Sequence, residues 1–164
     1  MNALGKILTG ELRNKADAIV AKYETKRASI LEILRLIMET HGYITLEAEE
    51  AVGEYLQIPI IDVHEVVSFY TLYYTKPKAK NRFNICRTLT CSMLGGIEIL
   101  KYLEKKLGVK EGEMSSDGEV SIHTVECLGA CEIAPMMQVN DCDYVGPLTQ
   151  AKIDDLVQGL KRGK

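Results

Sequence analysis

The stretch Arg82-Phe-Asn-Ile-Cys86 decides the fold of this chain, because it alternates between polar and apolar residues and ends in a cysteine. The alternation predicts a strand with Phe83 and Ile85 on one face. A second strand is predicted over Val120 to Val125, where β-branched residues are frequent. The residues between the two strands carry apolar side chains at helical spacing, so the unit reads strand, helix, strand. A right-handed crossover of this kind makes the two strands parallel neighbours.

The segments that follow complete a sheet with two helices. The crossover helix is predicted to begin after Gly95-Gly96 and to end at Gly108. Asn140-Asp141 separates two short apolar runs, which predicts an antiparallel hairpin, and residues 149–160 have the apolar periodicity of a last helix. This order predicts a thioredoxin-like domain over residues 79–164, built on a four-stranded mixed sheet.

The first half of the chain has a helical pattern instead. Apolar residues recur at helical spacing in four segments, and the predicted helices cover residues 12–23, 30–41, 46–56 and 62–70. Gly42 is expected to end the second helix, and Asp62 with Glu65 has the spacing of a capping box for the fourth. The polar stretch 76–81 reads as a linker. We therefore predict an N-terminal helical bundle over residues 1–78, and an α+β chain as a whole.

Four of the five cysteines, Cys86, Cys91, Cys127 and Cys131, are expected to meet at one edge of the sheet. Cys86 ends the first strand and Cys127 follows the second. The carboxyl ends of parallel strands lie side by side, and loops at that edge are where open α/β sheets bind ligands. Cys142 follows the hairpin turn, roughly 15 Å away along the third strand. We therefore predict that Cys142 is a half-buried strand residue and not a ligand.

The spacing of the four cysteines favours an iron–sulfur cluster over a single metal ion. They form C-x4-C and C-x3-C pairs, which are looser than the C-x2-C pairs frequent in structural zinc sites. A binuclear cluster is wider than one ion, because each iron takes two thiolates and sulfides fill the middle. Two alternatives remain, namely four ordinary buried cysteines and a zinc site in an interaction module without redox activity. A thioredoxin-type dithiol is excluded, since no C-x-x-C is present.

The composition argues against several other functions. The net charge is -3 and the basic residues are scattered, so nucleic acid is a poor partner. No apolar run approaches the ~20 residues of a membrane span, and no signal peptide is recognisable, so we expect a cytoplasmic protein without direct membrane insertion. The three histidines are spread out, and no glycine-rich phosphate loop is present. We expect no catalytic residue in this chain, and nicotinamide and flavin to bind elsewhere.

Three features of the helical half are interpreted from composition alone. The acidic stretch Glu47 to Glu50 reads as a solvated helix face. His64 reads as a surface or interface residue. Four aromatic residues lie close together in the sequence, and either partner contact or packing between the two halves would explain them. These residues are Phe69, Tyr70, Tyr73 and Tyr74.

Two cysteine segments, Cys86-Arg-Thr-Leu-Thr-Cys91 and Val125-Glu-Cys-Leu-Gly-Ala-Cys131, resemble those of the thioredoxin-like 2Fe–2S ferredoxins. Ala134-Pro135 downstream fits the same family. More closely, the chain is similar to the E subunits of NADH:quinone oxidoreductase, respiratory complex I. The segment Pro59-Ile-Ile-Asp-Val-His-Glu-Val-Val-Ser-Phe-Tyr70 resembles the helical region before the cluster domain in those subunits. The resemblance implies one 2Fe–2S cluster on the four paired cysteines, and the sequence departs from the family at none of them.

The resemblance also implies a partner and a role. In the family, another subunit of the same complex binds NADH and flavin mononucleotide (FMN), and the cluster-bearing chain docks on it and exchanges one electron with the flavin. The chain would then be part of an oxidoreductase without substrate chemistry of its own. It would lie in the cytoplasm, peripheral to the inner face of the cell membrane through the complex. The equivalent diaphorase subunit of an NAD-reducing hydrogenase or a formate dehydrogenase, and a stand-alone ferredoxin, are the alternatives.

Overall fold

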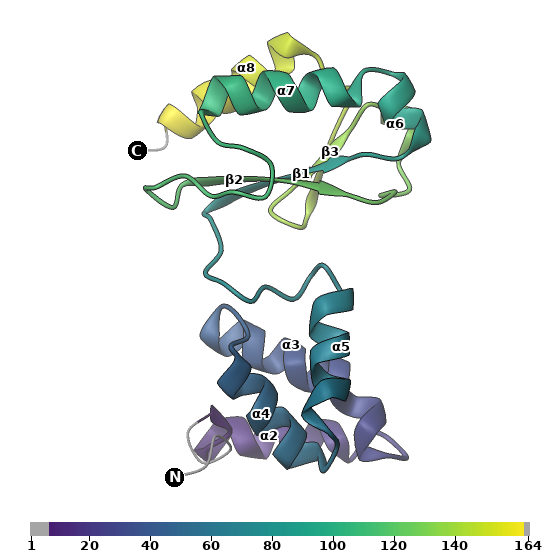
Figure 1. Ribbon diagram of the computed structural model, residues 1–164, viewed down its shortest axis with the longest axis vertical. Coiled ribbons are helices and arrows are strands. Elements are labelled where there is room, and N and C mark those ends of the chain that lie inside the picture. The colour runs from purple at the N-terminus through teal and green to yellow at the C-terminus, as the bar shows by residue number, and fades with distance from the viewer. Residues whose placement is uncertain (1–6, 163–164) are drawn as a thin grey trace. The chain divides into compact units, whose positions relative to one another are not determined.

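The computed structural model describes residues 7–162 and divides the chain into two compact units, Met1–Lys78 and Ala79–Lys164 (Figure 1). The first unit is helical, and the second contains a sheet covered by helices. Each unit has a hydrophobic core of its own. The description below therefore takes them one at a time.

The helical unit contains four α-helices and a short 3-10 helix within the described residues. They are α2 (Gly10–Val20), η1 (Lys26–Ser29), α3 (Ile30–His41), α4 (Leu46–Leu56) and α5 (Ile60–Phe69). The third predicted helix, 46–56, is confirmed at both ends. Gly42 ends α3 as predicted, with a positive φ of 84° that a residue with a side chain rarely adopts. Ile33, Leu34 and Ile37 form the centre of the core and are fully buried.

The start of α5 differs from the prediction. The helix begins at Ile60, directly after Pro59, and no side chain caps its first turn. Pro59 explains the earlier start, because proline fixes φ near the helical value and lacks the N–H that a first turn leaves unpaired. Asp62 lies inside the first turn and pairs with Arg27 of η1. The predicted capping box was therefore wrong, and Asp62 links two elements instead.

The acidic stretch of α4 is not wholly solvated, which corrects a second expectation. Glu47 and Glu50 are exposed, but only 1% of Glu49 is accessible. The Oε2 atom of Glu49 lies 2.8 Å from the Nδ1 atom of His64 on α5. The side chain of His64 is half exposed, so its outer edge meets water while its Nδ1 faces a buried carboxylate. The pair joins α4 to α5.

The α/β unit has the predicted order of strand, helix, strand, hairpin and helix. Its elements are β1 (Asn81–Cys86), α6 (Leu89–Met93), α7 (Gly96–Leu107), β2 (Val120–Val125), η2 (Cys131–Ile133), β3 (Met137–Val139), β4 (Asp143–Val145) and α8 (Gln150–Arg162). The sheet order is β2-β1-β3-β4. β1 and β2 are parallel, whereas β3 is antiparallel to both β1 and β4. The predicted four-stranded mixed sheet is thus confirmed.

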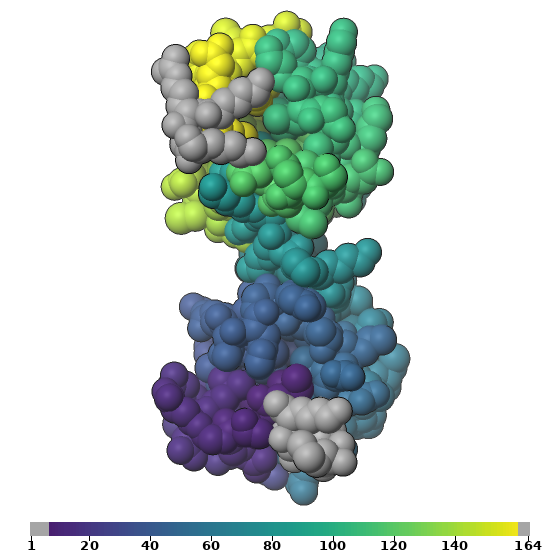
Figure 2. Space-filling model, turned by 90° about the vertical axis from the view of Figure 1, so that its left-hand side faces the viewer, coloured from purple at the N-terminus to yellow at the C-terminus, as the bar shows by residue number. Residues whose placement is uncertain are grey.

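The two long helices of this unit, α7 and α8, cover one face of the sheet (Figure 1). Phe83 and Ile85 of β1 point into this layer, as their alternation predicted, and pack with Leu103 and Ile153 of the helices. The hydroxyl of Tyr102 on α7 donates a 2.8 Å hydrogen bond to Asp154 of α8. In the space-filling view, α8 in yellow lies against the green segment that includes α7 (Figure 2).

The hairpin turn is formed by Asn140 and Asp141, which have φ values of 55° and 61°. Two positive φ angles are what a two-residue hairpin turn requires, and asparagine and aspartate tolerate them. The strands on either side are shorter than predicted, so Cys142 lies in the turn and is exposed. The expectation that Cys142 is a half-buried strand residue was therefore wrong.

Candidate functional site

The carboxyl ends of β1 and β2 lie side by side, which confirms the topological argument from sequence. Cys86, the last residue of β1, pairs in register with Val125, the last residue of β2. The next residue, Arg87, donates its backbone N–H to the carbonyl of Val125 at 3.0 Å. The chain therefore leaves both strands at the same edge, and Cys127 follows two residues later.

Cys86 and Cys91 are both buried, with exposed fractions of 3% and 2%. They pack with Ala130 and Met136 in a small apolar cluster at this edge of the sheet. Cys91 lies on α6, a one-turn helix that the sequence pattern did not predict because five residues show no periodicity. The hydroxyl of Ser92 donates a 2.8 Å hydrogen bond to the carbonyl of Arg87 and closes the loop between the two cysteines.

Gly96 is needed for this arrangement. A Cβ atom at Gly96 would lie 2.8 Å from the carbonyl oxygen of Cys91 and 3.5 Å from that of Cys86. Real Cβ atoms do not approach backbone so closely, so α7 can begin against the cysteine loop only with a glycine here. The sequence signalled a helix start at this position. It did not signal that the glycine lets the helix approach the candidate site.

The thiols of Cys86 and Cys91 differ in their acidity. Burial alone would raise the pKa of Cys86, but hydrogen bonds from Thr88, from Cys91 and from the backbone of Leu128 lower that pKa below its usual value. The Oγ1 atom of Thr88 lies 3.2 Å from the Cys86 sulfur. Burial raises the pKa of Cys91, and the negative charge of nearby Cys86 raises it further. Cys86 therefore favours the thiolate, which is the form of cysteine that binds metals.

The second cysteine pair is exposed and reaches the first. Cys127 and Cys131 are both accessible to solvent. The backbone N–H of Gly129, which has a φ of 73°, donates to the Cys127 sulfur at 3.4 Å. The backbone of Leu128, between the two cysteines, hydrogen-bonds Cys86. The charge of Cys131 acts on the pKa of Cys91. The structure therefore brings the two cysteine-bearing loops together.

These residues form two pairs rather than one compact group. Within residues 7–162, no three His, Cys, Asp or Glu side chains are grouped closely enough to hold a single metal ion. One pair is buried in an apolar cluster, and the other is open to solvent. The donor set offers four thiols and several backbone N–H groups beside them. That chemistry fits a group that takes its ligands two and two.

Cys142 lies at the opposite end of β1. Met137 pairs with Ile85 and Val139 pairs with Phe83, so β3 runs away from Cys86. The backbone N–H of Asn140 then bonds the carbonyl of Arg82 at 3.0 Å. Cys142 follows two residues later. Four residues of strand separate Arg82 from Cys86, or roughly 13 Å.

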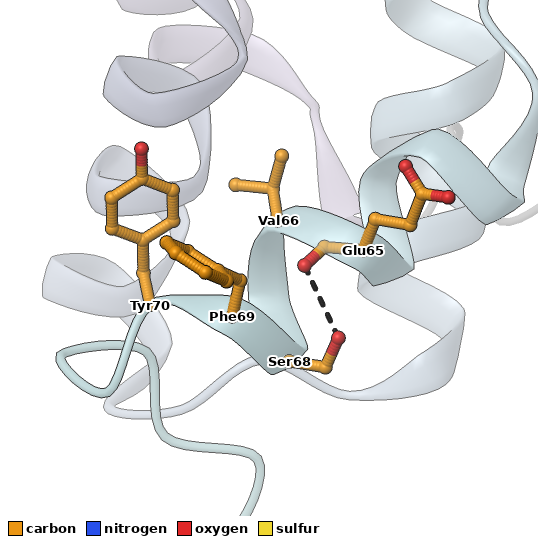
Figure 3. A pocket seen from close by; sticks show the side chains of 5 residues that line it. All are labelled: Glu65, Val66, Ser68, Phe69 and Tyr70. Atoms are coloured by element: carbon orange, nitrogen blue, oxygen red, sulfur yellow. Dashed lines mark hydrogen bonds between the residues drawn. The ribbon is translucent and has the colours of Figure 1, made fainter.

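The other large depression in the described chain belongs to the helical unit and contains no cysteine. It measures about 560 Å³ and lies at the end of α5, lined by Glu65, Val66, Ser68, Phe69 and Tyr70. Figure 3 shows the hydroxyl of Ser68 bonded to the carbonyl of Glu65 at 3.1 Å. The rings of Phe69 and Tyr70 meet edge to face, 5.1 Å apart. This surface offers no metal-binding or nucleophilic group.

Known proteins resemble this chain along most of its length. The family described as thioredoxin-like [2Fe-2S] ferredoxin matches residues 16–161. An E-type subunit of the NADH-quinone oxidoreductases of Rhizobium meliloti is 36% identical over 150 residues, which cover 92% of this chain and 89% of the relative. NADH-quinone oxidoreductase subunit 2 of Thermus thermophilus is 39% identical over 146 residues, which cover 88% of this chain and 81% of the relative.

A solved structure shares the fold at low identity. An NAD+-reducing [NiFe]-hydrogenase in the H2-reduced state superimposes with a TM-score of 0.69 and 17% identity over 85% of this chain. The match spans 23% of the longer hydrogenase chain. Together with the family match over residues 16–161 and the two relatives above, these likenesses show that this chain belongs to the thioredoxin-like [2Fe-2S] ferredoxins, among the E subunits of NADH-quinone oxidoreductases.

Proposed function

We propose that this chain is the electron-transfer subunit of an NADH:quinone oxidoreductase, and that Cys86, Cys91, Cys127 and Cys131 hold one [2Fe–2S] cluster. The observation that carries the proposal is the meeting of two cysteine-bearing loops where the parallel strands β1 and β2 end. When bound, such a cluster supplies a site that accepts or gives up one electron at a time.

The residues around the cysteines have distinct roles in this proposal. Cys86 and Cys91 form the buried pair, and burial keeps water from their sulfurs. Gly129 donates its N–H to Cys127, and Leu128 donates its N–H to Cys86. Hydrogen bonds to thiolate sulfurs stabilise negative charge, and they are one means by which a protein sets the reduction potential of a cluster.

The arrangement favours a cluster over zinc. A structural zinc ion draws four ligands to a single centre at about 2.3 Å from each sulfur. No group of three suitable side chains surrounds such a centre within residues 7–162. Two separate pairs match the needs of two irons, each of which takes two thiolates.

In this proposal the chain carries electrons, while NADH and FMN bind to another subunit of the same complex. The family relatives support it, since two of them are named as subunits of NADH-quinone oxidoreductases. None of the helices between residues 7 and 162 is both long and apolar enough to cross a membrane. We place the chain peripherally, at the cytoplasmic face of the membrane. A diaphorase subunit of a hydrogenase is the second candidate, supported by the shared fold alone.

Replacement of single cysteines by serine tests the ligand set. Cys127→Ser should abolish the reduced-state EPR signal or shift it strongly, because an oxygen ligand replaces a thiolate on one iron. Cys142→Ser is the matched control, since it removes an exposed cysteine at the far end of β1, and its spectrum should equal that of the unmodified chain. Iron and zinc are measured in the same samples. A colourless protein with one zinc ion would refute the cluster, and loss of the signal in Cys142→Ser would refute the ligand set.

A further inference from the structure

We propose that an exposed apolar surface around Cys91 is the permanent contact surface for the subunit that carries the flavin. The surface, called the α6 rim here, consists of Leu89, Met93, Leu94 and Ile97. The inference rests on the proposed function and adds the place of docking and the kind of contact. It locates the partner on the α/β unit, beside the cysteine loops.

The α6 rim arises from the way in which the one-turn helix α6 is placed. Cys91 faces inward and is 2% exposed, whereas Leu89 is 74% exposed and Met93 is 77% exposed. Leu89 and Met93 are four residues apart, so they share the outer face of the helix. Leu94 and Ile97 extend the same apolar surface to the start of α7. Large apolar side chains therefore cover the outside of the turn whose inside holds a proposed ligand.

The α6 rim is poor in charge. Residues 88–97 contain a single charged residue, Glu98 being just beyond them, and residues 127–131 contain no Asp, Glu, Lys or Arg, although 26% of the chain is charged.

 That one residue, Glu98, lies outside the range, on α7, so residues 88–97 themselves carry no charged side chain at all. The residues just before these two segments, Arg87 and Glu126, form an ion pair with each other. An apolar surface without charged side chains is typical of the core of a stable subunit interface. Transient electron-transfer partners are recognised by complementary charges and small contacts instead.

The position of the α6 rim identifies the occupant. The exposed cysteines, Cys127 and Cys131, lie on the loop that reaches Cys86 and Cys91, so an electron donor must approach at this edge. A second copy of this chain would bring one electron carrier to another and supply no donor. A flavin-carrying subunit that covers the rim would bring its cofactor to the exposed pair. In the hydrogenase, the same fold spans 23% of a longer chain, so there it is joined permanently to further protein.

A pair of methionine variants tests the α6 rim. Met93→Glu places a charge on the rim, and Met114→Glu places the same charge on another exposed methionine of the same unit, beside the start of β2. Binding of the full-length, cluster-loaded chain to the purified NADH-oxidising flavoprotein subunit of the same organism is measured by calorimetry. We expect Met93→Glu to weaken binding by about tenfold or more, because the charge would be desolvated without a partner. We expect Met114→Glu to bind like the unmodified chain, and all three proteins to show the same EPR signal.

The outcomes separate this inference from the proposed function. If the unmodified chain does not bind the flavoprotein, the proposed function fails and the α6 rim fails with it. If it binds and Met93→Glu binds equally well, the function stands and the rim is refuted. A steep loss of affinity with rising salt would contradict an uncharged contact. A dimer of this chain that Met93→Glu dissociates would assign the rim to a second copy and overturn the inference.

Discussion

At the scale of single residues, Glu49 shows what a composition argument overlooks. It lies in an acidic stretch, and any reading of local charge places it in solvent. The helix nevertheless turns Glu49 inward beside Ala48 and Val52 of the core. Burying a carboxylate is costly unless a hydrogen bond satisfies it, and His64 on the neighbouring helix provides that bond at 2.8 Å. The partner is 15 positions away in sequence, so local pattern reading cannot find it.

Removal of the imidazole should destabilise the helical unit. In His64→Ala the buried carboxylate of Glu49 loses its hydrogen-bond donor, and we expect the free energy of unfolding to fall by about 1–3 kcal/mol. Urea denaturation measures the loss. Since His64 is half exposed, water can partly replace it, and the lower half of that range is expected.

Two further variants isolate the contribution of this pair. Glu50→Gln changes an exposed neighbour in the same stretch and should alter the stability by less than about 0.5 kcal/mol. In a Glu49→Gln background, His64→Ala should cost less than it does alone, because no buried carboxylate is left without a donor. Equal losses in the two backgrounds would show that the 2.8 Å contact contributes nothing of its own.

At the scale of elements, the hairpin turn illustrates what a sequence predicts and what it leaves open. Asn140-Asp141 predicted the turn because both residues tolerate positive φ. The pattern does not reveal that the Asp141 carboxylate reaches across to β1. There Oδ2 accepts from Arg82 at 2.8 Å, and Oδ1 accepts from Asn84 at 2.9 Å. The turn therefore anchors the hairpin to the central strand as well as reversing the chain.

Neutralising this carboxylate should weaken the α/β unit. Asp141→Asn preserves the size of the side chain and its tolerance of positive φ, but it removes the charge that faces Arg82. The side chains of Arg82 and Asp141 are 13% and 17% exposed, so solvent screens the pair only weakly. We expect the free energy of unfolding to fall by about 1.5–3 kcal/mol, to be measured by chemical denaturation. Asp143→Asn, on exposed β4, is the control, and a loss as large as that of Asp141→Asn would contradict the anchoring role.

Element length decided which predictions were accurate. The helix of residues 46–56 and the strand of residues 120–125 have several turns or alternations, and both were located at their observed ends. The five residues of α6 and the three residues of η2 leave too few repeats for a period to show. Both short elements carry candidate ligands, Cys91 and Cys131. The parts of the fold that shape the site were therefore the least visible in the sequence.

At the scale of the whole molecule, chain order predicted where the cysteines would meet but not how. A crossover between parallel strands is enough to bring Cys86 and the loop of Cys127 to one edge. It does not say that the first pair is buried and the second exposed. It also cannot show that Gly96 makes room for α7, or that Leu128 bonds Cys86. Those features come from packing between segments far apart in sequence.

The two cores give reason to expect that the α/β unit folds on its own. Among the described residues, the members of the helical core lie between Leu8 and Val67, and those of the larger core of the α/β unit lie between Phe83 and Val157. We propose residues 79–164 as a separate domain. Each core is complete without side chains from the other, so cutting the chain at residue 79 removes no buried contact of the sheet. β1, which pairs with both β2 and β3, stays inside the fragment.

The fragment of residues 79–164 should therefore unfold cooperatively and retain the proposed cluster. We expect a single thermal transition by circular dichroism, an unfolding free energy of about 5 kcal/mol or more, and the EPR signal of the full chain. A fragment of residues 88–164 is the control. It lacks β1 and Cys86, so it should show neither the transition nor the signal. If the longer fragment melts without cooperativity, the helical unit is needed to complete the fold. If it folds but loses the signal, the helical unit contributes to holding the cluster, and the assignment of the site to the α/β unit alone is wrong.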